Sequence, residues 1–153
     1  MHALIYFVAA GEEEGEALAT VEECVMKWME RGVDYYSMPD EGYFKKIWGE
    51  RKVLTIDSEE GQKILKELIK ENLKVLHEEF KKAKEAIDKG DFDDAHYHLR
   101  MASGHPFSMN AFIDAYEPLL SEKQIDRLCK NYCLNANCIN SIKIWLVPVD
   151  IHY

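Results

Sequence analysis

Two apolar runs, near the start and the end of the chain, predict the centre of a β-sheet. Residues 2–9 read HALIYFVA, and residues 142–151 form a second apolar run that Pro148 interrupts. Strands that are apolar on both faces lie buried between two layers, so both segments are predicted as central strands. Shorter segments rich in β-forming residues, at 33–38 and 52–57, predict two further strands.

Apolar residues at steps of three and four predict a helix after the first strand, ending at Gly32, and a much longer one from the N-cap Ser58 to Lys89. The apolar positions of the long segment alternate in steps of four and three, which is heptad spacing: Ile69, Leu73, Leu76, Phe80, Ala83 and Ile87. Unbroken, it would be about 48 Å long, more than a compact domain of this size can cover. It must therefore kink, protrude with a partner helix, or pack against a second subunit.

The segment 90–102, GDFDDAHYHLRMA, predicts a second helix that turns back on the long one. It resembles the helical hairpin of tetratricopeptide repeats, but no second copy follows at that period, so we interpret it as a single αα-hairpin. We expect residues 73–89 and 92–103 to pack antiparallel around an apolar interior: Leu73, Leu76, Phe80, Ala95 and Leu99. Further helices are predicted at 108–117 and 121–133.

The order of these elements predicts an α+β fold. It matches a ferredoxin-like βαββαβ unit in one domain, 1–153, whose second helix has grown into a helical subdomain at 58–134. The first and last strands are then antiparallel neighbours. A ferredoxin-like sheet has one open face, which either the extra helices or a second subunit must cover. We expect a homodimer, because exposed apolar patches usually mark an interface.

Composition and charge indicate which classes of partner the chain can bind. The chain is 47% hydrophobic and 31% charged, which is typical of a globular protein. No apolar run reaches membrane-spanning length, and acids rather than a cleavage site follow the first strand, so a cytoplasmic protein with no membrane contact is expected. With 19 basic and 28 acidic residues, the net charge of −9 argues against direct nucleic-acid binding. The alternatives that fit this charge are a nucleic-acid mimic or a protein that binds a basic partner, such as an acidic inhibitor of a nucleic-acid-processing protein.

The four cysteines predict no zinc site, because no close CxxC pair occurs. Cys24, Cys129 and Cys133 fall within apolar helical stripes and are predicted to be buried thiols. Cys138, in the loop NANCIN, is the cysteine expected to be accessible.

Two groups of residues could bind a divalent metal. If the first and last strands pair, His2 falls near His152, with Asp150 on the same strand face, and two histidines with a carboxylate can hold iron or zinc. The second group, Asp94, His98 and His105, lies at helical spacing. The alternative interpretations are a polar end of the sheet for the first group and a solvated helix face for the second.

An aromatic group could line a ligand pocket through Tyr36, Tyr43 and Trp48. No nucleophile elbow, phosphate loop or HExxH motif occurs. The sequence therefore favours a binding or regulatory domain, with a metal-binding protein or metal-dependent enzyme as the alternative.

Two short motifs carry a resemblance to a known group of proteins. The segment VDYY at 33–36 and the closing VDIHY at 149–153 resemble small uncharacterised proteins of phages and plasmids, which combine an apolar first strand, an FDYY or FDWY segment and a terminal VDxH strand. There a glycine-rich GGRW segment follows the aromatic pair, whereas SMPDEGYFKKIWGE, residues 37–50, follows it here. The resemblance implies a shared fold and no established activity.

Overall fold

The computed structural model describes residues 1–105, 108–135 and 141–153, with side chains up to 132 in the second range. Its elements follow the chain in this order: β1 (His2–Gly11), α1 (Glu14–Met29), β2 (Tyr35–Ser37), α2 (Gly42–Trp48), β3 (Leu54–Thr55), α3 (Glu59–Lys89), α4 (Phe92–Ala102), β4 (Ala111–Phe112), α5 (Glu122–Asn135) and β5 (Lys143–His152).

The sheet is built on the antiparallel pair of β1 and β5, as the sequence predicts. These two strands pair along their whole lengths, from His2 opposite His152 to Gly11 opposite Lys143. β2 and β3 both pair with β5, at its two ends, and β4 runs parallel to β1 on the other side, which gives the order β2-β5-β1-β4. The fold is α+β. The strand order does not confirm the ferredoxin-like topology. In that topology the second neighbour of β1 would be a strand of the β2–β3 pair, whereas here it is β4, which runs parallel to β1.

The segment 108–117, predicted as a helix, instead supplies β4. Ala111 and Phe112 are wholly buried and point to opposite faces of the sheet, since Phe112 joins the core under α1 and Ala111 joins the core under α3. A short apolar run cannot be assigned to helix or strand by periodicity alone, which explains the error. The helix prediction for this segment is wrong.

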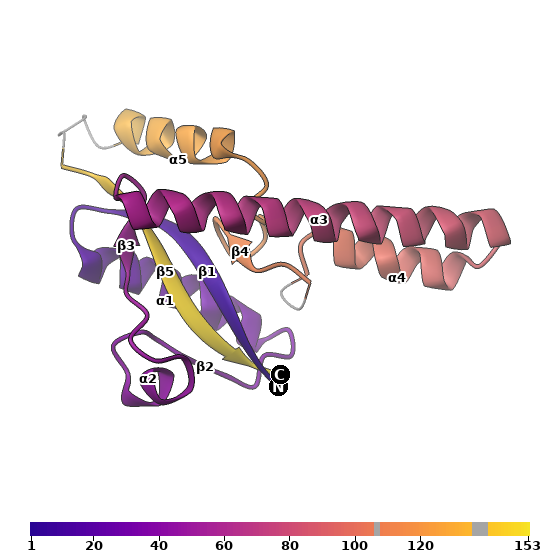
Figure 1. Cartoon of the computed structure of the whole chain (residues 1–153), viewed down its shortest axis with the longest axis horizontal. Coiled ribbons are helices and arrows are strands. Elements are labelled where there is room, and N and C mark those ends of the chain that lie inside the picture. The colour runs from indigo at the N-terminus through magenta and orange to yellow at the C-terminus, as the bar shows by residue number, and fades with distance from the viewer. Residues whose placement is uncertain (106–107, 136–140) are drawn as a thin grey trace.

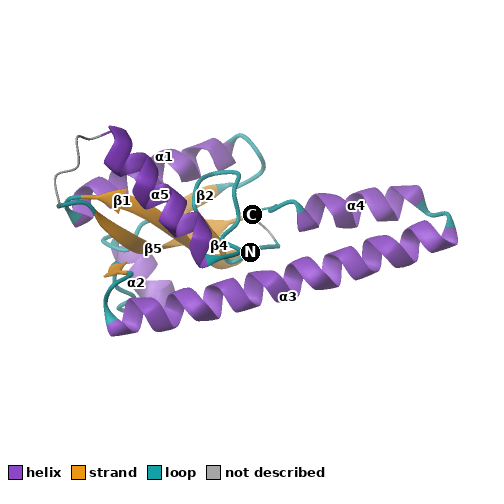
Figure 2. Ribbon diagram, turned by 90° about the horizontal axis from the view of Figure 1, so that it is seen from above, coloured by secondary structure: helices purple, strands orange, loops and turns teal. Residues whose placement is uncertain are grey.

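Both faces of the sheet are covered by helices of this chain (Figures 1 and 2). On one face, α1 packs Trp28 against Phe7 and Phe112, with ring centroids 5.1 and 4.8 Å apart, and the indole N–H of Trp28 donates to the carbonyl of Ala115 at 2.7 Å. On the other face, Leu65 of α3 and Ile125 of α5 cover Val8 and other even-numbered residues of β1 and β5. The helical subdomain, not a second subunit, therefore covers the second face.

The long helix leaves the body of the molecule halfway along its length. α3 begins at the cap Ser58, whose hydroxyl accepts from the Gly61 N–H at 3.0 Å, and ends at Gly90, which has a left-handed φ of 76°. Beyond the sheet, α3 pairs with α4 alone and forms a projecting two-helix unit, residues 73–102, which we call the arm (Figures 1 and 2). The predicted αα-hairpin is thus confirmed.

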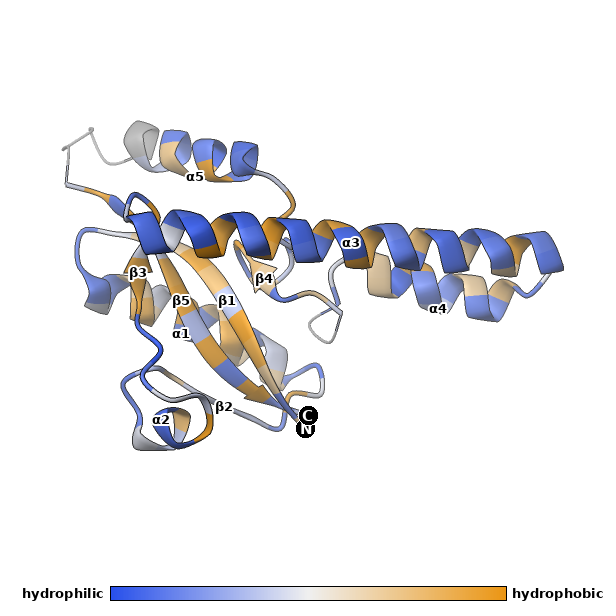
Figure 3. Cartoon of the chain, in the orientation of Figure 1, coloured by the Kyte–Doolittle hydropathy of each residue, from blue (hydrophilic) through white to orange (hydrophobic). Residues whose placement is uncertain are grey.

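The interior of the arm differs from the prediction. Its seam is lined by small residues: Ala83, Ala86, Ala95 and Ala102 are all buried. Leu73, Phe80 and Leu99, which we expected in the interior, are exposed on the surface of the arm. Hydrophobic and hydrophilic residues alternate along both helices of the arm (Figure 3). Alanines let the two helices approach so closely that the larger side chains are left beside the seam.

The structure bears on two further predictions, the burial of the cysteines and the absence of a membrane-spanning segment. Cys24 and Cys129 are half-buried rather than buried, packed against the edges of the two cores, and the side chains of Cys133 and Cys138 lie outside the described residues. Within the described ranges no helix is long and apolar enough to cross a membrane.

Candidate functional site

The richest cluster of polar and aromatic side chains lies where the two chain termini meet, at one end of the sheet. His2 on β1 stands directly opposite His152 on β5, and Tyr35 on β2 stands opposite His152 on the other side. Side chains of paired residues share a face of the sheet, so these three rings lie together. The short helix α2 adds Tyr43 and Trp48 to the same cluster.

Asp150 is the centre of this cluster. Its carboxylate is wholly buried, at 0% exposure, and accepts two hydrogen bonds. Nδ1 of His2 lies 2.9 Å from one carboxylate oxygen, and Nε1 of Trp48 donates to the other at 2.8 Å. An ionised carboxylate can only accept, so the proton of a neutral His2 ring sits on Nδ1 and the lone pair on Nε2.

Aromatic rings surround the remaining nitrogen of His2. The hydroxyl of Tyr43 lies 3.5 Å from Nε2, and the ring of His152 lies 5.0 Å from the His2 ring. Tyr35 stacks on His152, with centroids 5.0 Å apart and an interplanar angle of 22°. Burial raises the pKa of the Tyr35 phenol, and its hydrogen bond with Tyr43 and the nearby Asp150 charge raise it further. Tyr35 therefore stays protonated well into the alkaline range.

Two buried polar atoms in the cluster have no hydrogen-bond partner among the described residues: Oγ of Ser37 and Nδ1 of His152. Ser37 lies opposite Asp150 in the register of β2 and β5. Nδ1 of His152 is 3.4 Å from an Asp34 carboxylate oxygen, which is within ion-pair range but without hydrogen-bond geometry. Buried polar atoms of this kind usually bind water or a ligand.

The structure thus brings together most of the residues that the sequence singles out here, and it replaces one of them. His2, Asp150 and His152 meet as the strand pairing predicts, and Tyr43 and Trp48 join them. Tyr36 lies on the opposite face of β2, where its hydroxyl donates to Glu22 at 2.9 Å. Tyr35 takes its place, because it lies opposite His152 in the register of β2 and β5. The two residues are on different strands, so only that register identifies Tyr35.

The second predicted group is brought together only in part, because Asp94 lies close to His98 and His105 does not join them. Nδ1 of His98 lies 2.6 Å from a Glu79 carboxylate oxygen on α3, and its Nε2 lies 3.5 Å from Asp94. His105 follows Gly104, which ends the helical course with a φ of 88°, and lines a different pocket. Glu79 is the partner that the sequence pattern missed. Within the described ranges, no three His, Cys, Asp or Glu side chains converge on one metal position.

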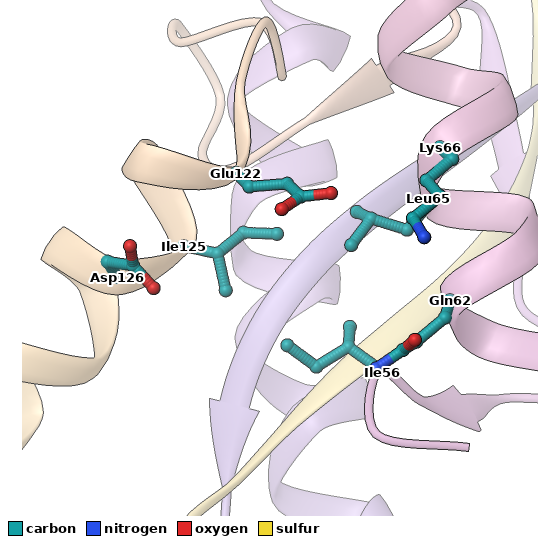
Figure 4. A pocket seen from close by; sticks show the side chains of 7 residues that line it. All are labelled: Ile56, Gln62, Leu65, Lys66, Glu122, Ile125 and Asp126. Atoms are coloured by element: carbon teal, nitrogen blue, oxygen red, sulfur yellow. The ribbon is translucent and has the colours of Figure 1, made fainter. Parts of the chain in front are cut away.

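A separate gap lies between the start of α3 and α5, with a volume of about 220 Å³. Leu65 and Ile125 face each other across it above Ile56, while charged side chains such as Lys66 and Glu122 form its rim (Figure 4). Its floor continues the core under α3. The gap holds none of the residues singled out from the sequence.

Comparison with known proteins gives one match. A family model described as a domain of unknown function, DUF7995, matches residues 1–153. No curated protein and no solved structure matches. The family has no established activity, in agreement with the sequence analysis, and the match does not bear on the resemblance to phage and plasmid proteins. The chain belongs to the DUF7995 family over its whole length.

Proposed function

We propose that this chain is a binding domain that works as a homodimer, in which the arms of two copies pack together as a four-helix bundle. The observation that carries the proposal is a set of large apolar side chains that the arm leaves in water. They are between 42% and 70% exposed: Leu73, Phe80, Ile87, Phe92 and Leu99. We call them the arm face.

The five side chains lie on one side of the arm. Those on α3 recur every seven residues and so form one stripe, as do the two on α4. The pair Glu79–His98 closes one side of the seam. Phe80 directly follows Glu79 in the sequence, and Leu99 directly follows His98. Each therefore points about 100° further round its helix than the residue before it. In antiparallel helices this rotation carries both toward the other side of the seam, so the two stripes form one surface.

The size of the arm face agrees with an interface. An aromatic side chain presents about 150–250 Å² when fully exposed, so each of these half-exposed residues leaves roughly 100 Å² in water. Five of them give about 500 Å² on each copy, near the upper end of the largest apolar patch on a typical monomer. Two copies together would bury about 1,000 Å², the lower bound for a specific interface, before the polar rim is counted.

A second copy is the occupant that the geometry favours. Identical faces pair most simply about a two-fold axis, because each copy offers the surface that the other needs. Since the arm projects beyond the sheet and its helices, two arms can meet without the two bodies clashing (Figures 1 and 2). Two antiparallel helix pairs then make a four-helix bundle with an apolar centre.

Sedimentation equilibrium at micromolar concentrations tests this proposal. We expect a mass near twice the 17.8 kDa of one chain. Phe80→Gln combined with Leu99→Gln should return the protein to a monomer with unchanged helicity, because both side chains are exposed in a single copy. The control Lys74→Gln, at an exposed position pointing away from the arm face, should leave the dimer intact. A wild-type mass of one chain at every concentration would overturn the homodimer, and the arm face would then be left for a different protein.

A second candidate function is metal binding at the His2 cluster, and one contact favours it. A carboxylate that holds one histidine nitrogen, so that the other can bind the metal, is the usual arrangement around a metal-ligating histidine. Here Asp150 holds Nδ1 of His2, with His152 close by. The Tyr43 hydroxyl lies 3.5 Å from Nε2 of His2, and a metal would displace it. Both Asp150 oxygens already accept hydrogen bonds, so His2 and His152 would be the ligands and Asp150 the orienting group.

Metal analysis of protein purified without chelators tests this candidate. We expect stoichiometric zinc, iron or manganese in the wild type and its loss in His2→Ala. His98→Ala, which changes a histidine outside the cluster, is the control and should retain the metal. Metal content that is substoichiometric, or equal in wild type and His2→Ala, would eliminate the candidate.

A further inference from the structure

We propose that a pocket at the base of the arm binds the phosphate group of a small phosphorylated molecule. The pocket has a volume of about 590 Å³. It is lined by Arg31, Arg100, Ser103, Gly104, His105 and Tyr116. This proposal is independent of the dimer, because none of these residues belongs to the arm face.

The pocket forms where three parts of the chain meet. Arg31 follows the end of α1, Arg100 lies in the last turn of α4, and Tyr116 lies in the connection from β4 to α5. Gly104 turns the chain here with a left-handed φ of 88°, and a Cβ at this position would lie 2.7 Å from the Pro118 ring. A glycine is therefore required to shape this wall.

The two arginines bring positive charge to the pocket without a matching acid. Among the described residues, neither Arg31 nor Arg100 has a carboxylate oxygen within 4.0 Å. The guanidinium of Arg31 lies over the Tyr116 ring, 4.3 Å from its centroid. Two acids near Tyr116 in sequence have other partners: Asp114 accepts from the backbone N–H groups of Tyr116 and Glu117, and Glu117 pairs with Arg127.

The positive charges of Arg31 and Arg100 both act on His105. Burial lowers the pKa of its imidazole, and the charges of Arg100 and Arg31 lower that pKa further. The ring is therefore neutral at neutral pH and adds no third positive charge to the pocket. A single arginine near the end of a helix is explained by the helix dipole. Two arginines from distant parts of the chain on the walls of one pocket, in a chain with a net charge of −9, require a further explanation.

A bound phosphate supplies that explanation. The planar guanidinium matches two phosphate oxygens at once. Two arginines therefore suit a doubly charged phosphate better than they suit a singly charged carboxylate. The volume falls within the range typical of small-molecule sites, roughly 300–1,000 Å³, and exceeds what inorganic phosphate needs. The remaining space can hold the group to which the phosphate is attached.

Calorimetric titration with inorganic pyrophosphate, at constant ionic strength adjusted with sodium chloride, tests the proposal. We expect saturable binding with a Kd below about 1 mM for the wild type. Arg31→Gln and Arg100→Gln should each weaken it by about tenfold, because each removes a charge-assisted contact. Arg51→Gln, at an exposed arginine that lines other pockets, is the matched control and should bind as the wild type does.

Three results would overturn the proposal: no saturable binding by the wild type, equal weakening by all three variants, or loss of binding in Arg51→Gln alone. Equal weakening would mean attraction to net charge rather than to this pocket. Both pocket arginines are exposed, so their replacement should leave the fold intact, and circular dichroism of each variant checks this.

Discussion

At the scale of single residues, Asp150 joins three elements of the fold. Its buried carboxylate lies on β5 and receives hydrogen bonds from His2 on β1 and from Trp48 at the end of α2. A buried charge is tolerated only when donors satisfy it, so each donor contributes more than an exposed hydrogen bond would. Asp150 thereby fixes α2 over the His2 cluster.

Trp48→Phe tests this connection, because it keeps an aromatic ring and removes the indole N–H. One oxygen of a buried carboxylate then loses its donor, and we expect the free energy of unfolding to fall by about 2–3 kcal/mol. Trp145→Phe is the matched control, since its indole donates to a neutral carbonyl, that of Gly11, at 3.0 Å. It should lose only about 1 kcal/mol. Urea denaturation measures both, and equal losses would show that the Asp150 charge gives the Trp48 bond no special weight.

Glu79 makes the stability of the arm sensitive to acid. Partial burial raises the pKa of its carboxyl, but hydrogen bonds from Lys82 and His98 lower it by more, so the pKa lies below its ordinary value. A carboxyl with a depressed folded-state pKa adds stability above its unfolded pKa, about 4.3, and loses it as the pH falls through the folded value. The free energy of unfolding, measured by urea denaturation with the helical signal at 222 nm, should therefore be higher for the wild type than for Glu79→Gln at pH 6. This difference should vanish near pH 3.

The control for Glu79 is Glu85→Gln. Glu85 lies on the same helix, is exposed, and faces Lys81 at a distance of 3.9 Å. Exposed pairs of this kind contribute little, so its replacement should change the unfolding curve by less than about 0.5 kcal/mol at either pH. A difference between wild type and Glu79→Gln that persists unchanged at pH 3 would contradict an electrostatic origin.

At the scale of elements, the side-chain amide of Asn72 connects α3 to β4 and to the segment between β4 and α5. Asn72 is wholly buried, and its Nδ2 donates to the carbonyls of Ala111 and Leu119, both at 2.9 Å. Its Oδ1 accepts from the backbone N–H of Asn110 at 2.8 Å. These bonds satisfy the outer edge of β4, which has no strand beyond it in the described sheet.

Asn72→Leu should destabilise the protein by about 2–3 kcal/mol, because the Leu119 carbonyl and the Asn110 N–H lose this partner, while the Ala111 carbonyl keeps the Leu119 N–H as its second donor. Asn72→Asp keeps the acceptor and loses both donated bonds, while burying a charge, so we expect it to be at least as harmful. Asn110→Leu leaves the backbone N–H in place and serves as the control, since the Asn110 side chain is exposed. Thermal and urea unfolding measure the losses, and a loss under about 1 kcal/mol for Asn72→Leu would exclude this role.

Periodicity predicts the long elements and fails where contacts between distant segments decide. The full length of α3 and the turn at Gly90 follow from local patterns, whereas the pairing of β1 with β5 followed from the assumed order of the strands. Phe80 and Ala86 both fit the helical pattern, but which of them lies in the seam depends on how closely α4 approaches. Asn72 looks like a solvent position within the heptads, because nothing local indicates that β4 will present backbone groups to it.

The candidate site shows the same division. Strand pairing was enough to place His2, Asp150 and His152 together. The choice of Tyr35 over Tyr36 required the exact register of a strand only three residues long. Arg31 and Arg100 lie 69 positions apart and meet only because α4 returns to the end of α1, so no local pattern could join them.

At the scale of the whole molecule, the chain has a body with two covered sheet faces and an arm that projects from it, with Val75 and Leu76 at the base of the arm packed against the core under α1. Among the described helices and strands, α3 alone packs extensively against α4. The sheet strands are held by two layers of helices, whereas α4 is held by one partner through small side chains. Local opening should therefore release the arm at a lower free energy than the sheet.

Amide hydrogen exchange can detect this difference and the dimer in one experiment. At low protein concentration, amides of α4 and of α3 beyond residue 80 should exchange through local opening, well before those of β1 and β5. If two arms form a bundle, raising the concentration a hundredfold should increase protection of the arm alone, since association stabilises only the segments that it buries. Phe80→Gln with Leu99→Gln should abolish this increase, and Lys74→Gln should preserve it. Equal protection of arm and sheet at every concentration would contradict the division of the molecule into two units, because an arm held by a single seam of alanines cannot match the stability of a core enclosed on both faces.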